Sequence, residues 1–212
     1  MRVLIVALAC LFALPAAAQK PGEPGRFDQY VLSLSWSPTY CASRAGRDDP
    51  DQCGGPKTYG FVVHGLWPQY AETGYPAQCV ADPKPVPDDV VAKTLPIMPS
   101  KKLIEHEWAR HGTCDGSNPA DYFAKTAQAF AVVKLPAEFA APKSMLTLAP
   151  EQVEDLFVKA NPGLKPDQIA VVCRGRYAAE LRVCMTKDLK FTDCGKSVRD
   201  RCAGQVMFPA VR

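Results

Sequence analysis

The sequence predicts an α+β fold, in which several helices pack on a central antiparallel β-sheet. Alternation of apolar and polar residues predicts strands near both ends of the chain, whereas the middle shows the wider spacing of amphipathic helices. Strands and helices do not alternate regularly, as they do in folds built on a parallel sheet. With 212 residues, 47% of them hydrophobic, and no internal repeat, the chain is long enough for one domain with a proper core.

The formal net charge of +3 is small for this length. It is compatible with a polyanionic partner, but it is not the concentrated positive charge of proteins that coat DNA. Charge alone therefore selects no partner.

The first eighteen residues, MRVLIVALACLFALPAAA, predict a signal peptide. Arg2 precedes an apolar run and three alanines, which is the pattern of a cleavable leader. The run is too short to span a bilayer, so we expect cleavage after Ala18 and an exported protein, periplasmic or extracellular, with no membrane segment. The expected organisation is a signal peptide at 1–18 and a single domain at 19–212. A lipid anchor at Cys10 is the alternative.

Outside this leader the chain has eight cysteines. An even number in an exported protein favours disulfides, although eight cysteines allow roughly a hundred pairings. Zinc binding is the competing use, but the sequence contains no CxxC pair. We therefore expect a disulfide-bonded domain with no metal and no cofactor.

The first predicted strand, 27–36 (FDQYVLSLSW), has alternate apolar residues from Tyr30 to Trp36 that face one way. A loop of charged residues and glycine follows. The second strand, 59–63 (YGFVV), is rich in β-forming residues and is expected to end at His64, before a turn locked by proline.

The remaining elements are a short helix within a proline-rich connection, three longer helices and two strands of a terminal antiparallel group. Gly112 ends the first long helix, proline begins the second, and acidic residues in the first turn favour the third. In chain order we expect helices at 88–94, 101–111, 119–133 and 150–160, and strands at 169–174 and 178–185.

The first long helix holds two of the three histidines in the chain. Measured from His106 around a helix, Arg110 lies at ~40°. Glu107 lies at ~100° and His111 at ~140° by the same geometry. Two imidazoles, a carboxylate and a guanidinium thus share one face, which indicates a functional site. The alternative is a solvated face that carries a Glu–Arg pair.

The third histidine, His64, lies in the other unusual segment. A single histidine at a strand end is more often structural than catalytic, but here all three histidines fall in two short segments. If the segments meet, one imidazole can remove a proton, a second can donate a proton and a third can bind phosphate. Arg110 can stabilise charge on the phosphate oxygens. The set predicts phosphodiester cleavage.

These segments, FVVHGLWPQ (61–69) and HEWARHGTC (106–114), resemble the two active-site segments of the ribonuclease T2 family. The flanks FDQYVLSLSWSPTYC (27–41) and CRGRYAAELRVCMTKDLKFTDC (173–194) are also similar to that family. The resemblance covers most of the chain after the leader. It implies an exported, disulfide-bonded α+β enzyme that cuts RNA by transphosphorylation without a metal.

The resemblance implies that His64 and His111 are the acid–base pair, with His111 as the base toward the 2′-hydroxyl and His64 as the acid. It makes His106 the phosphate-binding histidine and Glu107 the carboxylate that assists it. Arg110 stands where the family usually has lysine. We therefore expect activity with altered efficiency, because a planar guanidinium is not equivalent to an ammonium group.

Trp67 and Tyr75 match the positions at which the family stacks the base upstream of the scissile bond. Stacking accepts any base, which implies low base specificity. Ordinary core packing is the alternative for both aromatics. Gln69 replaces an acidic residue found in some members, so base preference is open.

Leu103 and Ile104 replace a Phe-Trp pair that is common in the family, which weakens the case for a second base site around Leu103. Lys101 is placed to steer further phosphates. A solvated pair with Lys102 is the alternative.

The resemblance also implies the disulfides. One closes the early loop, one anchors the end of the catalytic helix, and two lie in the terminal sheet. The implied pairs are Cys41–Cys53, Cys79–Cys114, Cys173–Cys202 and Cys184–Cys194.

The implied substrate is single-stranded RNA. Without a metal, the nucleophile is the 2′-hydroxyl, which DNA lacks, so we expect no DNA cleavage. The first product is a 2′,3′-cyclic phosphate, which water opens to a 3′-phosphate. We expect the protein to be a monomer.

Two other functions fit part of the pattern. HEWARH resembles the HExxH motif of zinc peptidases, but its histidines are five residues apart instead of four and do not share one stripe. The second is a non-catalytic member of the same fold that serves as a secreted binding protein.

Overall fold

The computed structural model describes residues 22–212, so the predicted signal peptide at 1–18 lies outside the described residues. The elements in chain order are β1 (Gln29–Trp36), α1 (Ser37–Cys41), α2 (Arg44–Arg47), α3 (Pro50–Cys53), β2 (Phe61–Gln69), α4 (Asp88–Thr94), α5 (Lys101–Arg110), η1 (Gly112–Cys114), α6 (Pro119–Val132), η2 (Ala137–Phe139), β3 (Leu146–Leu148), α7 (Pro150–Ala160), η3 (Pro166–Gln168), β4 (Ile169–Arg174), β5 (Tyr177–Met185) and β6 (Val206–Phe208).

The described strands form one six-stranded sheet in the order β2-β1-β5-β6-β3, with β4 paired to β5. All pairings are antiparallel except that of β5 with β6, which is parallel and joins only Tyr177 to Met207. The predicted α+β fold with a central, essentially antiparallel sheet is confirmed. The short strands β3 and β6 were not predicted.

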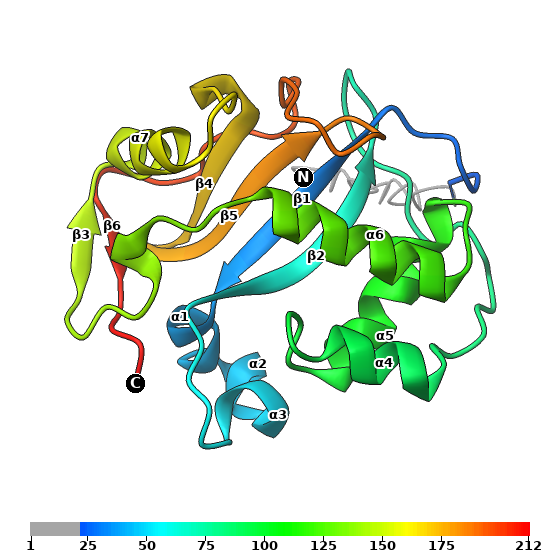
Figure 1. Ribbon diagram of the computed structural model, residues 1–212, viewed down its shortest axis with the longest axis horizontal. Coiled ribbons are helices and arrows are strands. Elements are labelled where there is room, and N and C mark those ends of the chain that lie inside the picture. The colour runs from blue at the N-terminus through cyan, green and yellow to red at the C-terminus, as the bar shows by residue number, and fades with distance from the viewer. Residues whose placement is uncertain (1–21) are drawn as a thin grey trace, which may run out of the picture.

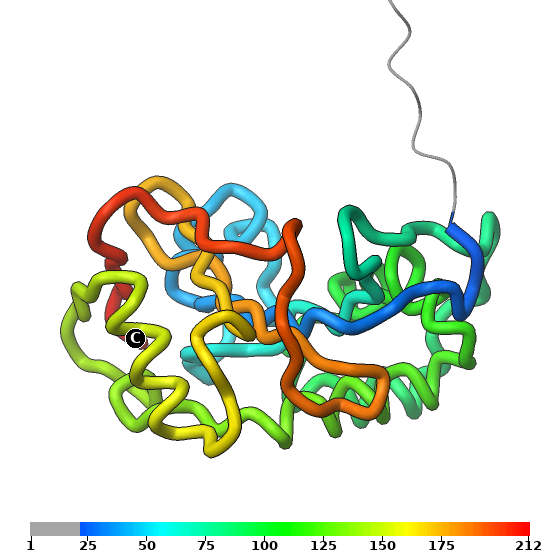
Figure 2. Tube along the Cα trace, turned by 90° about the horizontal axis from the view of Figure 1, so that it is seen from above, coloured from blue at the N-terminus to red at the C-terminus, as the bar shows by residue number. Residues whose placement is uncertain are grey.

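Helices cover the sheet unevenly. In Figure 1, α6 crosses the front of the sheet and α4 and α5 lie beside the β2 edge. Seen from above in Figure 2, α6 lies on one side of β1 and the short helices after β1 lie on the other. The two faces of the sheet are therefore covered by different helices.

The main core lies on the α6 side. The alternate β1 residues from Tyr30 to Trp36 that were predicted to face one way are all buried in it, together with Phe123 of α6 and Phe157 of α7. Burial of a large apolar side chain contributes about 1.5–3 kcal/mol. The opposite face has a smaller cluster around Val31 and Trp67, and the candidate site lies on this face.

The second strand is longer than predicted. The sequence indicated a strand at 59–63 that ends at His64, but β2 continues through His64 to Gln69. The segment after His64, which was expected to form a turn, continues as strand because β2 lies at an edge of the sheet, where proline is tolerated. Pro68 accordingly lies opposite Tyr30 of β1.

All four implied disulfides are confirmed. The structure pairs Cys41 with Cys53, Cys79 with Cys114, Cys173 with Cys202, and Cys184 with Cys194. Across residues 22–212 no helix has the length and apolar character needed to cross a membrane.

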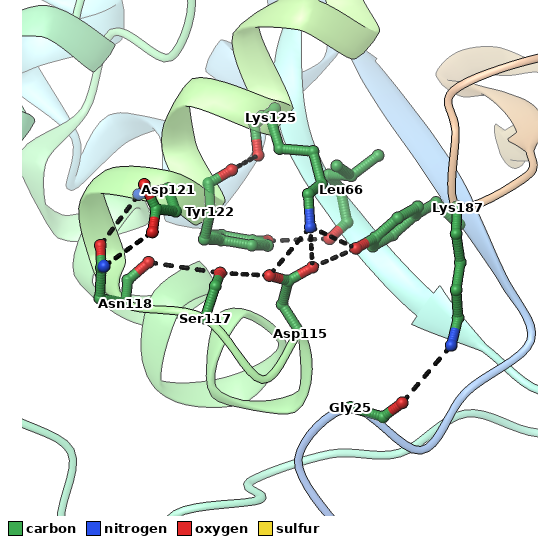
Figure 3. Close-up of polar contacts among 11 residues, drawn as sticks. Gly25, Leu66, Asp115, Ser117, Asn118, Asp121, Tyr122, Lys125 and Lys187 are labelled. Carbon is green, nitrogen blue, oxygen red and sulfur yellow. Dashed lines mark hydrogen bonds and ion pairs between the residues drawn. The ribbon is translucent and has the colours of Figure 1, made fainter.

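A buried ionic network fastens the segment that follows α5. Asp115 forms an ion pair with Lys125 of α6, with 2.9 Å between Oδ1 and Nζ, and accepts hydrogen bonds from the hydroxyls of Tyr30 and Ser117. Figure 3 shows Lys125 and Ser117 directed at this carboxylate. The network joins β1, α6 and the end of η1, and so fixes the place of the segment that follows α5.

Candidate active site

A β-bulge directs His64 toward the candidate site. In the pairing of β2 with β1, Val63 lies opposite Leu34 and Gly65 lies opposite Ser33, so His64 is an extra residue without a partner in β1. Such an insertion re-aims a side chain. His64 thereby reaches the sheet face that also presents side chains of β5.

Gly65 permits helix α5 to approach this strand. A Cβ at Gly65 would lie 2.1 Å from Glu107 Oε2 and 2.4 Å from Trp67 Nε1. Any side chain there would displace both groups. The glycine is therefore required by the close approach of a carboxylate.

Helix α5 begins with a capped turn, in which the Ser100 hydroxyl accepts a hydrogen bond from the backbone N–H of Leu103. The helix ends at Arg110 instead of His111, and Gly112 begins η1. A Cβ at Gly112 would lie 2.4 Å from the Trp108 ring, so this glycine serves close packing and is not a helix stop with positive φ.

Glu107 is the centre of the site and is only 1% exposed. Its Oε2 accepts a hydrogen bond of 2.7 Å from the indole Nε1 of Trp67. Its Oε1 lies 3.6 Å from Nε2 of His64. The solvated Glu–Arg face that was the alternative interpretation of α5 is therefore wrong for this carboxylate.

His111 lies between two aromatic rings. Its ring centroid is 5.4 Å from that of Trp67 and 5.7 Å from that of Tyr75. Its Nδ1 is buried and has no hydrogen-bond partner among the described residues. Arg110 donates a hydrogen bond of 3.3 Å to the Tyr75 hydroxyl. The loop after β2 and the end of α5 are thus joined around His111.

Two polar residues of the site were not predicted from the sequence. Glu180 Oε1 lies 3.0 Å from Nδ1 of His64, and the guanidinium of Arg182 lies 5.1 Å from the Trp67 ring centroid. Both belong to β5. Their spacing of two residues placed them on one face of a predicted strand, but only the pairing of β5 with β1 brings that face to His64.

The two histidines proposed as acid and base have opposite pKa shifts. Burial lowers the pKa of His64, but the carboxylates of Glu180 and Glu107 outweigh it and raise the pKa above its usual value. Burial and then the charge of Arg110 lower the pKa of His111 to about 3. At neutral pH the arrangement favours a charged His64 and a neutral His111.

The two carboxylates differ as well. Burial raises the pKa of Glu107 to about 7, against the opposing effects of His64 and the Trp67 indole. Burial also acts to raise the pKa of Glu180, but His64 and Arg182 lower it to about 2. Glu180 is therefore charged throughout the range in which Glu107 titrates.

His106 is exposed on α5. Burial, even though partial, and the positive charge of Arg110 lower its pKa. Among residues 22–212, no three His, Cys, Asp or Glu side chains are grouped to hold a metal ion.

Two hollows flank the candidate catalytic side chains. The larger, about 420 Å³, is lined by Trp67, Gln69, Thr73, Gly74, Tyr75, His111 and residues of the terminal sheet and its loop. The smaller, about 150 Å³, is lined by His64, Leu103, Glu180 and residues from α1, α3 and β4. Trp67 and Gln69 are both largely buried, so Trp67 combines core packing with a place in the hollow wall.

Lys101 does not line either hollow. Its Nζ pairs with Asp88 of α4 at 3.1 Å, and it borders a different depression near Tyr59 and Leu95. The structure therefore does not support the predicted contact between Lys101 and the substrate. Six of the other predicted site residues line the two hollows, and Glu107 and Arg110 contact members of that set. His106 lies on the same helix. The six are His64, Trp67, Gln69, Tyr75, Leu103 and His111.

The profile of the Ribonuclease T2 family matches residues 27–194. The chain is similar to a ribonuclease of Aeromonas hydrophila, with 42% identity over 125 residues, or 58% of this chain and 54% of the relative. It is also similar to a probable ribonuclease of Haemophilus influenzae, with 40% identity over 120 residues, or 51% and 44%. The matched part thus spans about half the length of these two relatives.

Among solved structures, trichomaglin, described as a novel S-like ribonuclease, is similar in fold. The TM-score is 0.70 with 23% sequence identity, and the alignment covers 88% of this chain and 99% of that chain.

Proposed function

The chain belongs to the ribonuclease T2 family, and from this premise we propose that it is an endoribonuclease that cleaves single-stranded RNA by metal-independent transphosphorylation. The observation that carries the proposal is that His64 and His111, from two distant segments, both lie beside Trp67, with ring centroids 5.2 and 5.4 Å from that of the indole. Their pKa values shift in opposite directions, as an acid and a base require. The first products are a 2′,3′-cyclic phosphate and a free 5′-hydroxyl. Water then opens the cyclic phosphate to a 3′-phosphate.

His111 is the general base. Its lowered pKa keeps the imidazole neutral, so it can take the proton of the 2′-hydroxyl as that oxygen attacks phosphorus. His64 is the general acid, and its proton passes to the 5′-oxygen as the bond from phosphorus to that oxygen breaks. His111 is then charged and His64 neutral, so the opening of the cyclic phosphate by water restores both.

Arg110, His106 and Glu107 stabilise the charge that develops on the phosphate oxygens. The Arg110 guanidinium keeps its positive charge at every relevant pH, and His106 lies one helical turn before it. A Glu107 with a pKa of about 7 is partly protonated near neutrality. It can then donate a hydrogen bond to the phosphate instead of repelling it.

The larger hollow takes the base upstream of the scissile bond, between Trp67 and Tyr75. Stacking on an aromatic ring is worth about 1–3 kcal/mol per base and accepts every base, which supports low base specificity. Leu103 offers the downstream base an aliphatic surface in the smaller hollow. A base can enter either hollow only when it is unstacked, so the substrate is single-stranded. DNA lacks the attacking hydroxyl and is not cleaved.

Export to the periplasm or outside the cell fits the four disulfides, since such bonds persist in oxidising compartments. We expect the protein to act as a monomer, because all proposed catalytic groups come from one chain.

Digestion of the sixteen dinucleoside phosphates, with EDTA present throughout, tests the proposed function. The wild type should cleave most of them to 2′,3′-cyclic phosphates. His64→Ala should lower kcat/KM by about 10²–10⁴-fold, the usual contribution of a general acid. Lys93→Ala, an exposed residue of α4 that pairs with Asp89, is the control and should cleave normally.

Loss of wild-type activity on addition of EDTA would refute metal independence. Absence of cleavage at every pH from about 4 to 8, the range in which histidine titrates, would instead favour a non-catalytic binding protein.

A further inference from the structure

The carboxylate of Glu180 has a different partner on each oxygen. Its Oε2 accepts two hydrogen bonds from Arg182, of 2.9 Å from Nε and 2.6 Å from Nη2. Its Oε1 is 3.0 Å from Nδ1 of His64. Two bonds from a planar guanidinium fix the orientation of a carboxylate, so Arg182 holds Oε1 in line with the His64 ring.

Glu180 lies on a strand that is paired on both sides. It lies on β5 opposite Ser35 of the central strand β1, and its side chain is 16% exposed. Arg182, which holds it, packs over the indole of Trp67. The carboxylate is therefore held on a paired strand, not on a mobile loop.

With Nδ1 directed at Glu180, only Nε2 of His64 is available to the substrate. This atom already faces the centre of the site, 3.6 Å from Glu107 Oε1. We propose that Glu180 is the positioning residue of His64, which keeps the imidazole protonated and directs its Nε2–H, not its Nδ1–H, to the leaving 5′-oxygen. This inference rests on the proposed function, in which His64 is the acid.

The proton balance is consistent with this role. His64 loses the Nε2 proton to the 5′-oxygen and keeps its Nδ1–H, which still donates to Glu180. The neutral ring is then in the tautomer that can take a proton from water at Nε2 in the second step. Glu180 stays ionised throughout, as does the carboxylate that orients the histidine of a serine protease.

Several other charged groups surround His64, and their effects on its pKa must be distinguished from the effect of Glu180. Glu107 titrates near pH 7, so its charge varies across the working range, whereas Glu180 remains charged. The positively charged groups oppose the two carboxylates. Arg182 lowers the pKa of His64, and the other two histidines are repelled by the charge of His64 when they are protonated. The groups are Glu180 and Arg182 from β5 and His106, Glu107 and His111 from α5 and its terminus.

Glu180→Gln tests the inference, because it keeps the shape of the side chain and removes its charge. Loss of an opposite charge at this distance should lower the pKa of His64 by about 1–2 units. NMR titration of the imidazole C–H resonances measures this directly, and only three histidines need assignment. Glu180→Asp should restore part of the shift. Glu151→Gln, which removes an exposed carboxylate from the first turn of α7, outside the site, is the charge-matched control.

Kinetics distinguish positioning from general damage. For a dinucleoside phosphate, the alkaline limb of kcat/KM should move to lower pH in Glu180→Gln, and the rate above that limb should fall about 10–100-fold for a pKa change of 1–2 units. For a nucleoside 3′-(4-nitrophenyl phosphate), whose leaving group needs no proton, the rate should be nearly unchanged. Glu151→Gln should match wild type on both substrates.

The inference is overturned if the His64 pKa is the same in Glu180→Gln as in wild type, or if both substrates lose rate equally. If Glu180→Gln does not fold, the same comparisons are made with Glu180→Asp, whose displaced carboxylate should lower the His64 pKa by less. A wild type that cleaves no RNA refutes the proposed function instead, and the NMR titration then still decides whether Glu180 sets the protonation of His64.

Discussion

Replacement of Asp115 by alanine is expected to destabilise the fold by about 3–5 kcal/mol at pH 7, the usual cost of removing one partner of a buried ion pair. The carboxylate side chain is fully buried. Its removal leaves the Lys125 ammonium, which is one-third exposed, and the buried hydroxyl of Tyr30 without their shared acceptor. For a protein of this length the melting temperature should fall by about 6–20 °C.

The effect should depend on pH. Burial acts to raise the pKa of Asp115, but hydrogen bonds from Ser117 and Tyr30 and the charge of Lys125 outweigh it and lower the pKa. A carboxyl group with a lowered pKa contributes stability above its unfolded pKa of about 4, and this contribution is lost as pH falls through the folded pKa. The difference between wild type and variant should therefore be largest at neutral pH and shrink in acid.

Urea unfolding followed by tryptophan fluorescence, with disulfides intact and at several pH values, measures this difference. Asp121→Ala serves as the control, since Asp121 is exposed in the first turn of α6 and should cost about 0.5 kcal/mol or less. An Asp115→Ala protein within about 1 kcal/mol of wild type at pH 7 would contradict the reasoning. A difference that is constant from pH 7 to acid would contradict the assigned charge state.

Three further predictions concern single sites. Gly65→Ala should reduce kcat/KM more than about 10²-fold, because its Cβ would overlap Glu107; Gly55→Ala, with open space around it, should cleave RNA normally. The kcat of Arg110→Lys should remain within about tenfold of the wild-type value, since the charge is kept. The kcat of Arg110→Ala should fall about 10²–10³-fold. Equal kcat values for the two variants would contradict this prediction. Burial and then the charge of Asp200 raise the pKa of Glu154 to about 7, so the carboxyl group costs the fold stability as pH rises above its unfolded pKa of about 4; Glu154→Gln should be more stable than wild type at pH 8, and calorimetry should show this difference shrink as pH falls toward about 4.

Much of the fold could be predicted because its signals are local. The helices at 88–94 and 150–160 and the strand at 169–174 match the structure in both bounds, since prolines beside the helices and the spacing of apolar residues mark their ends. The short strands β3 and β6 have three residues each, which is too few to show alternation of apolar and polar residues. The disulfide pairs are confirmed, but they came from the family resemblance, because spacing alone left the pairing open.

The parts of the site that the sequence did not predict depend on contacts between segments that lie far apart in the chain. The sequence placed His64 at a strand end, yet it lies at a bulge, and a bulge exists only relative to the register of the neighbouring strand. Glu180 and Arg182 were missed because nothing within β5 indicates that β1 is its neighbour. The place of Lys101 outside both hollows could not be predicted either, because its pairing with Asp88 depends on how α4 packs beside α5.

Strand β2, which carries His64, lies at one edge of the sheet. Open strand edges invite pairing with other chains and so aggregation. Here the N–H of Val63 is already bonded to the Ile97 carbonyl at 2.9 Å, Pro68 has no N–H to offer, and the extra residue at His64 breaks the regular spacing. The irregularity that re-aims His64 thus also makes β2 a poor template for intermolecular β-sheet.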